Sequence, residues 1–148
     1  QFIAKKISLS YEPVERTVIT DKKWLSFVIE QVISNAVKYT KTGGIKIYLE
    51  DGDGTMLVPV QKASHRKEDD GENSGMKSVC LVIEDTGIGI RAEDLPRICE
   101  MGYTGCNGHE GQHSSGIGLY LCSRILKKLG HAFSITSKEG VGTVVKIG

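Results

Sequence analysis

The sequence predicts an α/β fold in which a sheet carries helices on one face. Several short runs of apolar and β-branched residues are typical of strands, and most of them are joined by turns that would make hairpins. Two longer segments instead repeat apolar residues at steps of three and four, the period of a helix packed on one side. A chain of 148 residues suits one domain with its own core, so we assign residues 1–148 to a single domain.

The first part of the chain is predicted to form two strands and a long helix. Residues 2–11 alternate in part between apolar and polar side chains, and residues 17–20 are a second short strand. A helix is expected from Lys22 to about Tyr39, because Asp21 can cap its first amides and Lys-Thr-Gly-Gly follows its end. The apolar stripe of this helix, which should face the core, consists of Leu25, Ile29, Val32 and Ala36.

Residues 51–78 are predicted to be a flexible insertion between two strands. The strand before it, residues 45–50, alternates apolar and polar side chains, and the strand after it, residues 79–84, is mostly apolar. Only residues 56–60 within the insertion have the composition of a strand, and the rest is rich in Gly, Asp, Glu and Ser. We therefore expect a solvated loop and not a second domain.

The last part is predicted to contain two helices and a hairpin. A short helix is expected to begin at residues 92–95, and glycines crowd residues 102–115. Residues 116–129 repeat apolar side chains at helical steps and end in Lys-Lys-Leu-Gly, a helix C-terminal signature. Residues 132–137 and 143–147 would close the fold as a hairpin around Glu-Gly-Val-Gly.

Composition and charge exclude several classes of function. The formal net charge is +1, which gives no basic field for nucleic acid or for an anionic membrane. No apolar run approaches the roughly 20 residues that span a bilayer, and no signal peptide is recognisable. Because the first residue is Gln and not Met, we expect the chain to be a piece of a longer protein.

The cysteines favour a reducing compartment over a disulfide framework. Cys80 and Cys122 stand in apolar runs, where a free thiol behaves as a small hydrophobe, and no CxxC pair is present. One group of zinc-ligand residue types is left as a weak alternative, because its spacing matches no usual zinc pattern. It consists of Cys99, Cys106, His109 and His113.

A second stripe on the first helix is polar. Gln31, Asn35 and Lys38 follow one another at helical steps, rotated by about 100° from the core stripe. A solvated surface is one interpretation. The other is a row that faces a cleft, where amide oxygens meet a hard cation and the lysine meets a phosphate. The helix alone leaves both open.

Two glycine-containing stretches are candidates for a ligand site. EDTGIGI ends an apolar strand at Asp85 and then places Gly87 and Gly89 at alternate positions, which is either turn chemistry or close approach of a ligand. SSGIGL places Gly116 and Gly118 where a helix begins, which is either close helix packing or a phosphate site. Neither a P-loop nor a GxGxxG stretch between strand and helix is present.

Taken in order, these segments resemble the catalytic and ATP-binding domain of bacterial sensor histidine kinases, in the wider family shared with gyrase, Hsp90 and MutL. The segments are SNAVKY, EDTGIGI, the glycine-rich stretch, SSGIGLYL and EGVGT, and the resemblance covers nearly the whole chain outside residues 51–78. It implies a Bergerat-type ATP-binding fold, which is a two-layer α/β sandwich whose mixed sheet is covered on one face by helices. The implied cofactors are ATP and Mg²⁺.

The resemblance also implies roles for individual residues. Asn35 would ligate Mg²⁺ between the phosphates, Lys38 would neutralise phosphate charge, and these two are the catalytic candidates. Tyr39 would lie against the adenine. Asp85 would accept a hydrogen bond from the adenine 6-amino group, and Thr143 would help to fix the adenine through water beside it.

Further nucleotide contacts are implied for the glycines and for two neighbouring residues. Gly87 and Gly89 would let the base and ribose lie against the backbone. Gly116 and Gly118 would open a helix beneath the triphosphate. The remaining nucleotide-binding positions are Ile90 and Leu119.

The chain departs from the family's pattern at three positions. Cys99 stands where the short helix before the lid usually carries an aromatic residue, and Gln31 replaces the usual first asparagine of the N-box. His109 stands where a basic lid residue is expected, which puts γ-phosphate stabilisation by the lid in doubt. The stretches MGYTGCNG and LYLC are nevertheless similar to small sensor kinases that accompany peptide-antibiotic transporters.

Gln31 favours a histidine kinase over the related enzymes. ATPase relatives and anti-sigma-factor serine kinases carry a glutamate general base four residues before the N-box asparagine, and glutamine cannot accept a proton at neutral pH. An imidazole acceptor is already a nucleophile and needs no such base. The alternatives are a related ATPase or serine kinase, and a nucleotide-binding module without catalysis.

The phosphoacceptor is expected outside this chain. None of the four histidines stands in a context like H-E-x-x-x-P: His65, His109, His113 and His131. The resemblance implies transfer of the γ-phosphate to a histidine on the protein's own dimerisation hairpin, and from there to a response regulator. It implies a cytoplasmic domain of a membrane-anchored homodimer, with no nucleic-acid partner.

Overall fold

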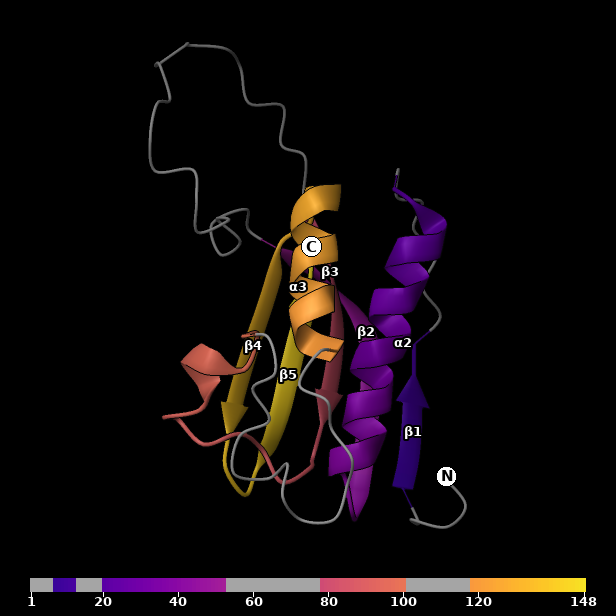
Figure 1. The fold of residues 1–148 in the computed structure, drawn as a ribbon. Coiled ribbons are helices and arrows are strands. Elements are labelled where there is room, and N and C mark those ends of the chain that lie inside the picture. The colour runs from indigo at the N-terminus through magenta and orange to yellow at the C-terminus, as the bar shows by residue number, and fades with distance from the viewer. Residues whose placement is uncertain (1–6, 13–19, 53–77, 101–117) are drawn as a thin grey trace.

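A computed structural model of the chain describes residues 7–12, 20–52, 78–100 and 118–148. Within these residues, five strands form one sheet in the order β1-β2-β3-β5-β4, and the helices α2 and α3 lie on the same face of it (Figure 1). The elements are β1 (Ile7–Tyr11), α2 (Lys22–Tyr39), β2 (Gly43–Gly52), β3 (Ser78–Asp85), the short 3₁₀ helix η1 (Leu95–Arg97), α3 (Gly118–Leu129), β4 (Phe133–Lys138) and β5 (Gly142–Ile147).

The sheet is mixed, as the fold class predicted. β1 pairs with β2 in parallel, and the pairings of β2 with β3, β3 with β5 and β4 with β5 are antiparallel. The predicted insertion leaves from β2 and returns to β3 at adjacent places, because Gly52 lies opposite Ser78. Residues 53–77, including the candidate strand 56–60, are outside the described residues, as are residues 2–6 and 17–19.

Local signals in the sequence set both ends of α2. The Asp21 carboxylate accepts hydrogen bonds from the amides of Lys23 (3.1 Å) and Trp24 (3.3 Å), as an N-cap does. At the other end Thr40 has an extended backbone, and its amide donates to the carbonyl oxygen of Ala36. The predicted helix and its cap are therefore confirmed.

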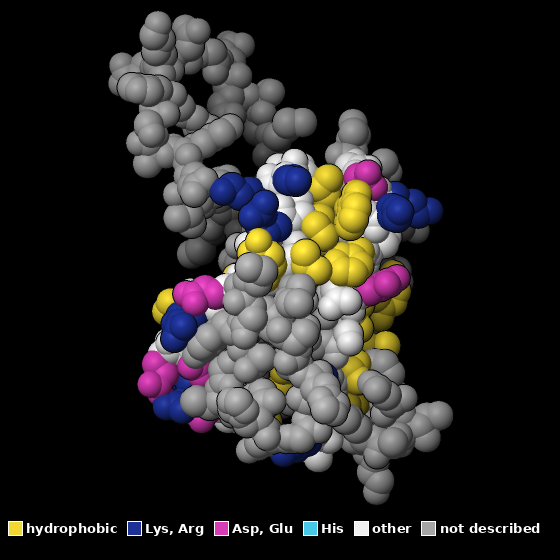
Figure 2. All heavy atoms as spheres, viewed as in Figure 1, with side chains coloured by type: hydrophobic (Ala, Val, Ile, Leu, Met, Phe, Trp, Pro, Cys, Tyr) yellow, Lys and Arg dark blue, Asp and Glu magenta, His cyan; other side chains and the backbone are white. Residues whose placement is uncertain are grey.

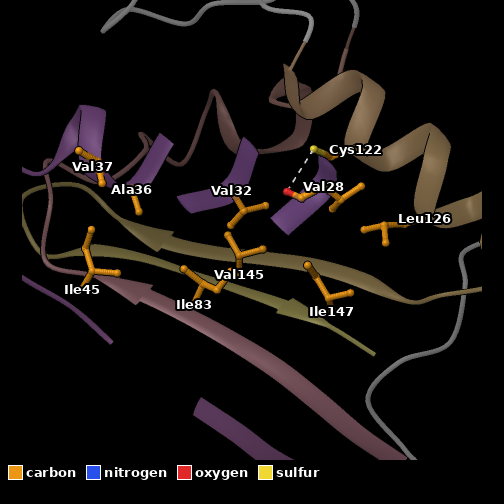
Figure 3. Close-up of a cluster of buried hydrophobic side chains, with 10 residues drawn as sticks. All are labelled: Val28, Val32, Ala36, Val37, Ile45, Ile83, Cys122, Leu126, Val145 and Ile147. Carbon is orange, nitrogen blue, oxygen red and sulfur yellow. Dashed lines mark hydrogen bonds between the residues drawn. The ribbon is translucent and has the colours of Figure 1, made fainter. Parts of the chain in front are cut away.

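The core lies between the sheet and the two helices, and it corrects one prediction. The buried residues of α2 are Val28, Val32, Ala36 and Val37, whereas Leu25 and Ile29 are only partly buried (Figure 3). The buried arc is rotated because α2 packs against α3 as well as against the sheet: the Cys122 thiol of α3 lies 3.9 Å from the Val28 carbonyl oxygen. The apolar periodicity predicted the helix correctly, but it did not predict which side chains lie at the centre of the buried face.

Proline and glycine influence where η1 begins and where the last hairpin turns. Residues 92–94 form a turn and η1 starts only at Leu95, because Pro96 lacks an amide hydrogen and is tolerated only in the first turn of a helix. The short helix predicted from residues 92–95 is thus displaced toward the C-terminus. The last hairpin is confirmed, with Gly140 at φ +76° in its turn.

The outer surface of the helical layer is partly apolar. Figure 2 shows hydrophobic side chains gathered over α2 and α3 in the upper half of the view, with lysine and arginine side chains on both sides of them. Trp24 at the start of α2 is 47% exposed, and its ring contacts Phe27 edge-on with centroids 6.4 Å apart. Among the described helices, none is long and apolar enough to cross a membrane.

Candidate nucleotide-binding site

Several of the predicted site residues that the structure describes lie toward one end of the sheet. In Figure 1, α2 and β3 both end at the lower end of the molecule, the hairpin between β4 and β5 turns there, and the lower end of α3 is its start. The register of the sheet places Asp85, the last residue of β3, opposite Thr143 of β5. Segments far apart in the sequence therefore contribute to one region.

Asp85 is a partly buried carboxylate held by backbone amides. Its Oδ1 accepts a hydrogen bond from the Gly87 amide at 2.8 Å. Burial raises the pKa of the Asp85 carboxyl above its ordinary value, whereas hydrogen bonds from the backbone of Gly87 and Thr143 act to lower the pKa and the charge of Glu84 acts to raise it. An ionised carboxylate has about four acceptor positions, so these two amides leave capacity for a further donor.

The loop after Asp85 is fixed on the side of α2 and β2. The Thr86 amide donates to the Gly44 carbonyl oxygen at 3.1 Å, and the Thr86 hydroxyl accepts from the Gly44 amide at 2.9 Å. The Ile88 amide donates to the carbonyl oxygen of Tyr39, the last residue of α2, at 3.1 Å. These bonds tie the loop to the position where the helix ends.

The same loop is fixed on its other side by the β4–β5 hairpin. The Gly140 amide donates to the Ile88 carbonyl oxygen at 2.8 Å, and the Ile90 amide donates to the Ser137 hydroxyl oxygen, also at 2.8 Å. Ser137 in turn bonds the Gly142 carbonyl oxygen and the Thr143 hydroxyl, each at 2.9 Å. The loop is therefore held in one conformation from both sides.

Gly87 and Gly89 both have a structural reason to be glycine. A Cβ atom on Gly87 would lie 2.6 Å from the Tyr39 carbonyl oxygen and 2.7 Å from Asp85 Oδ1. Gly89 has φ +72°, and a Cβ atom there would lie 2.1 Å from the Lys138 carbonyl oxygen. Close approach of the protein's own backbone thus accounts for both glycines, and their contact with base and ribose stays a prediction.

The polar stripe on α2 is not plain solvated surface. Gln31, Asn35 and Lys38 are all partly buried, whereas the neighbouring Glu30 and Ser34 are exposed. Gln31, the first residue of the stripe, faces the start of α3, because a Cβ atom on Gly118 would lie 3.0 Å from the Gln31 side-chain oxygen. The structure thus brings Gln31 of α2 close to Gly118 of α3, although the two residues are far apart in the sequence.

Tyr39 and Lys38 already interact with each other. The Lys38 ammonium nitrogen lies 5.2 Å from the centroid of the Tyr39 ring, within the range of a cation–π contact. Tyr39 is partly buried, and its carbonyl oxygen anchors the loop as described above. The backbone of Tyr39 is thus placed beside the loop that follows Asp85.

For the other predicted residues the structure gives mainly the degree of burial, or does not describe them. Ile90 and Leu119 are partly buried, and Gly116 is outside the described residues. Of the four candidate zinc ligands only Cys99 is described, so the zinc alternative is untested. Within the described residues, no group of three or more His, Cys, Asp or Glu side chains could hold a metal ion.

Two residues of this region were missed in the sequence. Ser137 connects the loop to the hairpin, and its position opposite Thr143 follows from the hairpin register once the turn is known. Thr40 is fully buried beside Gly87, where a Cβ atom would lie 3.0 Å from the Thr40 hydroxyl oxygen. No local pattern distinguishes this threonine from an ordinary helix end.

Comparisons with known proteins identify similar sequences. Residues 20–148 match the family described as histidine kinase-, DNA gyrase B-, and HSP90-like ATPase. The chain is 35% identical over 135 residues to the sensor histidine kinase YxdK of Bacillus subtilis, and this match covers 89% of the chain and 34% of YxdK. It is 34% identical over 134 residues to the sensor protein kinase GraS of Staphylococcus aureus, covering 90% of the chain and 32% of GraS.

Solved structures share the fold. The mycobacterial sensor histidine kinase MprB has a TM-score of 0.70 at 20% identity, covering 99% of this chain and 85% of that one. Full-length ShkA in complex with AMPPNP has a TM-score of 0.69 at 22% identity, covering 98% of this chain and 26% of that one. The two-layer arrangement with a mixed sheet is thus common to this chain and to histidine kinase structures. The chain spans about a third of the length of the curated relatives it matches.

Proposed function

The chain belongs to the family of histidine kinase-, DNA gyrase B-, and HSP90-like ATPases, and from this premise we propose that it binds Mg·ATP and presents the γ-phosphate to a histidine of a sensor kinase. The observation that carries the proposal is Asp85, a partly buried carboxylate with spare acceptor capacity in a loop held from both sides. The relatives named sensor kinases support the choice among members of the family.

The proposed base site uses Asp85 to select adenine. The adenine 6-amino group is a donor, whereas guanine carries a carbonyl oxygen at that position, which would face the carboxylate as a second acceptor. A polar group left unpaired in a partly buried site costs about 1–3 kcal/mol, so this contact discriminates between the two bases. Tyr39 would lie against the ring, and Thr143 would assist through water.

The proposed phosphate site lies between α2 and the start of α3. Asn35 and Lys38 follow Gln31 on the partly buried stripe, and Gln31 lies beside Gly118, which supports a site where an amide oxygen, an ammonium group and helix-terminal amides would meet the phosphates. Mg²⁺ fits this donor set, because it usually takes one or two protein oxygens plus substrate phosphates and water. When bound with ATP, the ion would neutralise phosphate charge, and Asn35 would be its protein ligand.

The proposed partners follow from the whole proteins that the relatives represent. We infer a homodimer anchored in the plasma membrane, whose cytoplasmic ATP-binding domain phosphorylates a histidine on its own dimerisation hairpin. The phosphate would then pass to an aspartate of a response regulator. Gln31 supports this over a related ATPase or serine kinase, since no carboxylate base stands at that position.

Two measurements test the proposal. Calorimetric titration should show ATP binding to the wild-type chain. Asp85→Asn should weaken this binding by roughly 5- to 150-fold, because the asparagine NH2 group can face the adenine 6-amino group, and both groups are hydrogen-bond donors. Thr136→Val, an exposed substitution on β4, is a control that should bind normally. Unchanged affinity in Asp85→Asn would refute the base site.

The second measurement concerns phosphoryl transfer. With γ-labelled ATP, the chain alone should remain unlabelled, and a cognate helical hairpin supplied in trans should acquire acid-labile, alkali-stable phosphate. Acid-stable phosphate on a serine would favour the serine kinase, and brisk hydrolysis without transfer would favour the ATPase. ATP binding with neither reaction would identify a binding module without catalysis.

A further inference from the structure

Thr40 carries an unexplained hydroxyl group in the middle of the site. It is 0% exposed, and among the described residues its Oγ1 is a buried side-chain oxygen without a hydrogen-bond partner. A hydroxyl buried in this way destabilises the fold, whereas a valine of the same shape would not. A buried polar atom without a partner therefore calls for a role in another state of the protein.

The surroundings of Thr40 indicate which group it serves. Three oxygen atoms approach the place where a Cβ atom on Gly87 would stand: the Tyr39 carbonyl oxygen at 2.6 Å, Asp85 Oδ1 at 2.7 Å and Thr40 Oγ1 at 3.0 Å. The carbonyl and carboxylate oxygens are acceptors, and only the hydroxyl among the three has a hydrogen to give. The Tyr39 oxygen already accepts from the Ile88 amide. The Asp85 carboxylate is the charged acceptor of the set.

We propose that Thr40 is a positioning residue for Asp85, whose hydroxyl donates to the carboxylate when a bound purine base excludes water from it. The inference rests on the proposed function, because it needs a base at Asp85. A base that covers Asp85 removes water from the charged oxygens. A hydrogen bond from a protein donor then stabilises the carboxylate more than it does in the free protein. We expect a rotation of the Thr40 or Asp85 side chain to supply this hydrogen bond. The cost of the unpaired hydroxyl in the free protein is offset in the complex.

The test compares three variants with the wild type. Thr40→Val keeps the shape and removes the hydroxyl, Thr40→Ser keeps the hydroxyl, and Thr136→Val is the exposed control. Without nucleotide, Thr40→Val should melt at the wild-type temperature or above it. Its ADP affinity at pH 7 should nevertheless fall roughly tenfold, the value of one hydrogen bond to a charged group. Thr40→Ser and Thr136→Val should bind like the wild type.

A pH profile separates positioning from mere packing. ADP affinity should decline on the acid side as Asp85 becomes protonated, and the deficit of Thr40→Val should shrink as the pH falls, because the hydroxyl stabilises only the ionised carboxylate of the complex. The charged groups on the elements around Asp85 are unchanged in every variant: Glu84 on β3, Lys46 on β2, Lys38 on α2, and Lys138 and Glu139 at the hairpin. Titration of ADP itself cancels in the ratio of variant to wild type.

The outcomes are distinct. If Thr40→Val binds ADP like the wild type at every pH, or loses affinity by the same factor at every pH, Thr40 does not position Asp85. If Thr40→Ser loses as much as Thr40→Val, the hydroxyl is not the responsible group. Failure of the wild type to bind ADP would overturn the proposed function, and the role of Thr40 with it. Wild-type binding together with an unaffected Thr40→Val overturns the role of Thr40 alone.

Discussion

At the scale of single residues, Asp85 combines a cost to stability with the proposed role in nucleotide binding. Burial raises the pKa of its carboxyl in the folded protein, so the ionised form is less favourable there than in the unfolded chain. Below the ordinary carboxyl pKa the group is protonated in both states and the cost is absent. The cost grows as the pH rises through the folded-state pKa and is complete above it.

Asp85→Asn should therefore stabilise the nucleotide-free domain at neutral pH while it weakens ATP binding. The asparagine oxygen can still accept from the Gly87 amide, and no charge is buried. Urea denaturation at pH 7 and at about pH 4 measures the difference, since ordinary Asp values lie near 4. The gain of the variant over the wild type should be larger at pH 7. A larger gain at pH 4 would mean that the amide hydrogen bonds to the carboxylate outweigh its desolvation.

Asn35 tests the metal at the same scale. Asn35→Ala should weaken ATP binding when Mg²⁺ is present and change it little in EDTA, because the lost amide oxygen is a proposed ligand of the ion. Calorimetry in the two buffers gives the comparison, and the exposed neighbour substitution Ser34→Ala is its control. Equal losses in both buffers would assign Asn35 to the fold.

At the scale of elements, the β4–β5 hairpin supports the candidate site and is not only an edge of the sheet. Its Ser137 hydroxyl contacts the Ile90 amide, the Gly142 carbonyl oxygen and the Thr143 hydroxyl. The hairpin thus fixes the loop that follows Asp85. We therefore expect a substitution in β4 that breaks these contacts to weaken nucleotide binding.

Ser137→Ala should leave the Ile90 amide without its partner and loosen the loop. We expect a loss of about 1–3 kcal/mol in unfolding free energy, together with weaker ATP binding. Thermal or urea unfolding with and without ATP measures both effects. Ser134→Ala, on the same strand, is the control. If Ser137→Ala lost stability but bound ATP normally, the hairpin would support the fold without positioning the loop.

At the scale of the whole molecule, the insertion at residues 53–77 separates β2 and β3 in the sequence but does not interrupt their pairing in the sheet. β2 and β3 are paired over eight positions from Ile45 opposite Asp85 to Gly52 opposite Ser78, so the insertion starts and ends at neighbouring strand ends far along the sheet from Asp85. The site end of β3 is thus separated from residues 53–77 by the length of the strand pair.

Replacing residues 54–75 by a short turn should therefore keep both the melting temperature and the ATP affinity near their wild-type values. Closing a long surface loop costs only slightly more entropy than closing a short one. Scanning calorimetry and ATP titration of the shortened chain are the measurements. A large fall in melting temperature would show that residues 56–60 contribute a strand to the fold, and a selective fall in affinity would connect the insertion to the site.

The sequence by itself determined the elements and the ordered motifs. Asp21 caps α2 through bonds to amides two and three residues away, and the strands and last hairpin follow from alternation and turn residues, all of which are local. The position of Asp85 at a strand end was equally plain, because an apolar run stops there.

Only the tertiary structure decided how these pieces meet. α2 buries Val28 and Val37 more deeply than the predicted Leu25 and Ile29, which pack against the core while only partly buried, because the partners of α2 are a sheet and a second helix whose positions no local pattern encodes. The reason for glycine at position 89, the contact of Ser137 with the loop and the unpaired Thr40 hydroxyl likewise depend on segments distant in the chain. Periodicity and capping act over a few residues, whereas these contacts arise from sheet register and from helix packing, which are long-range.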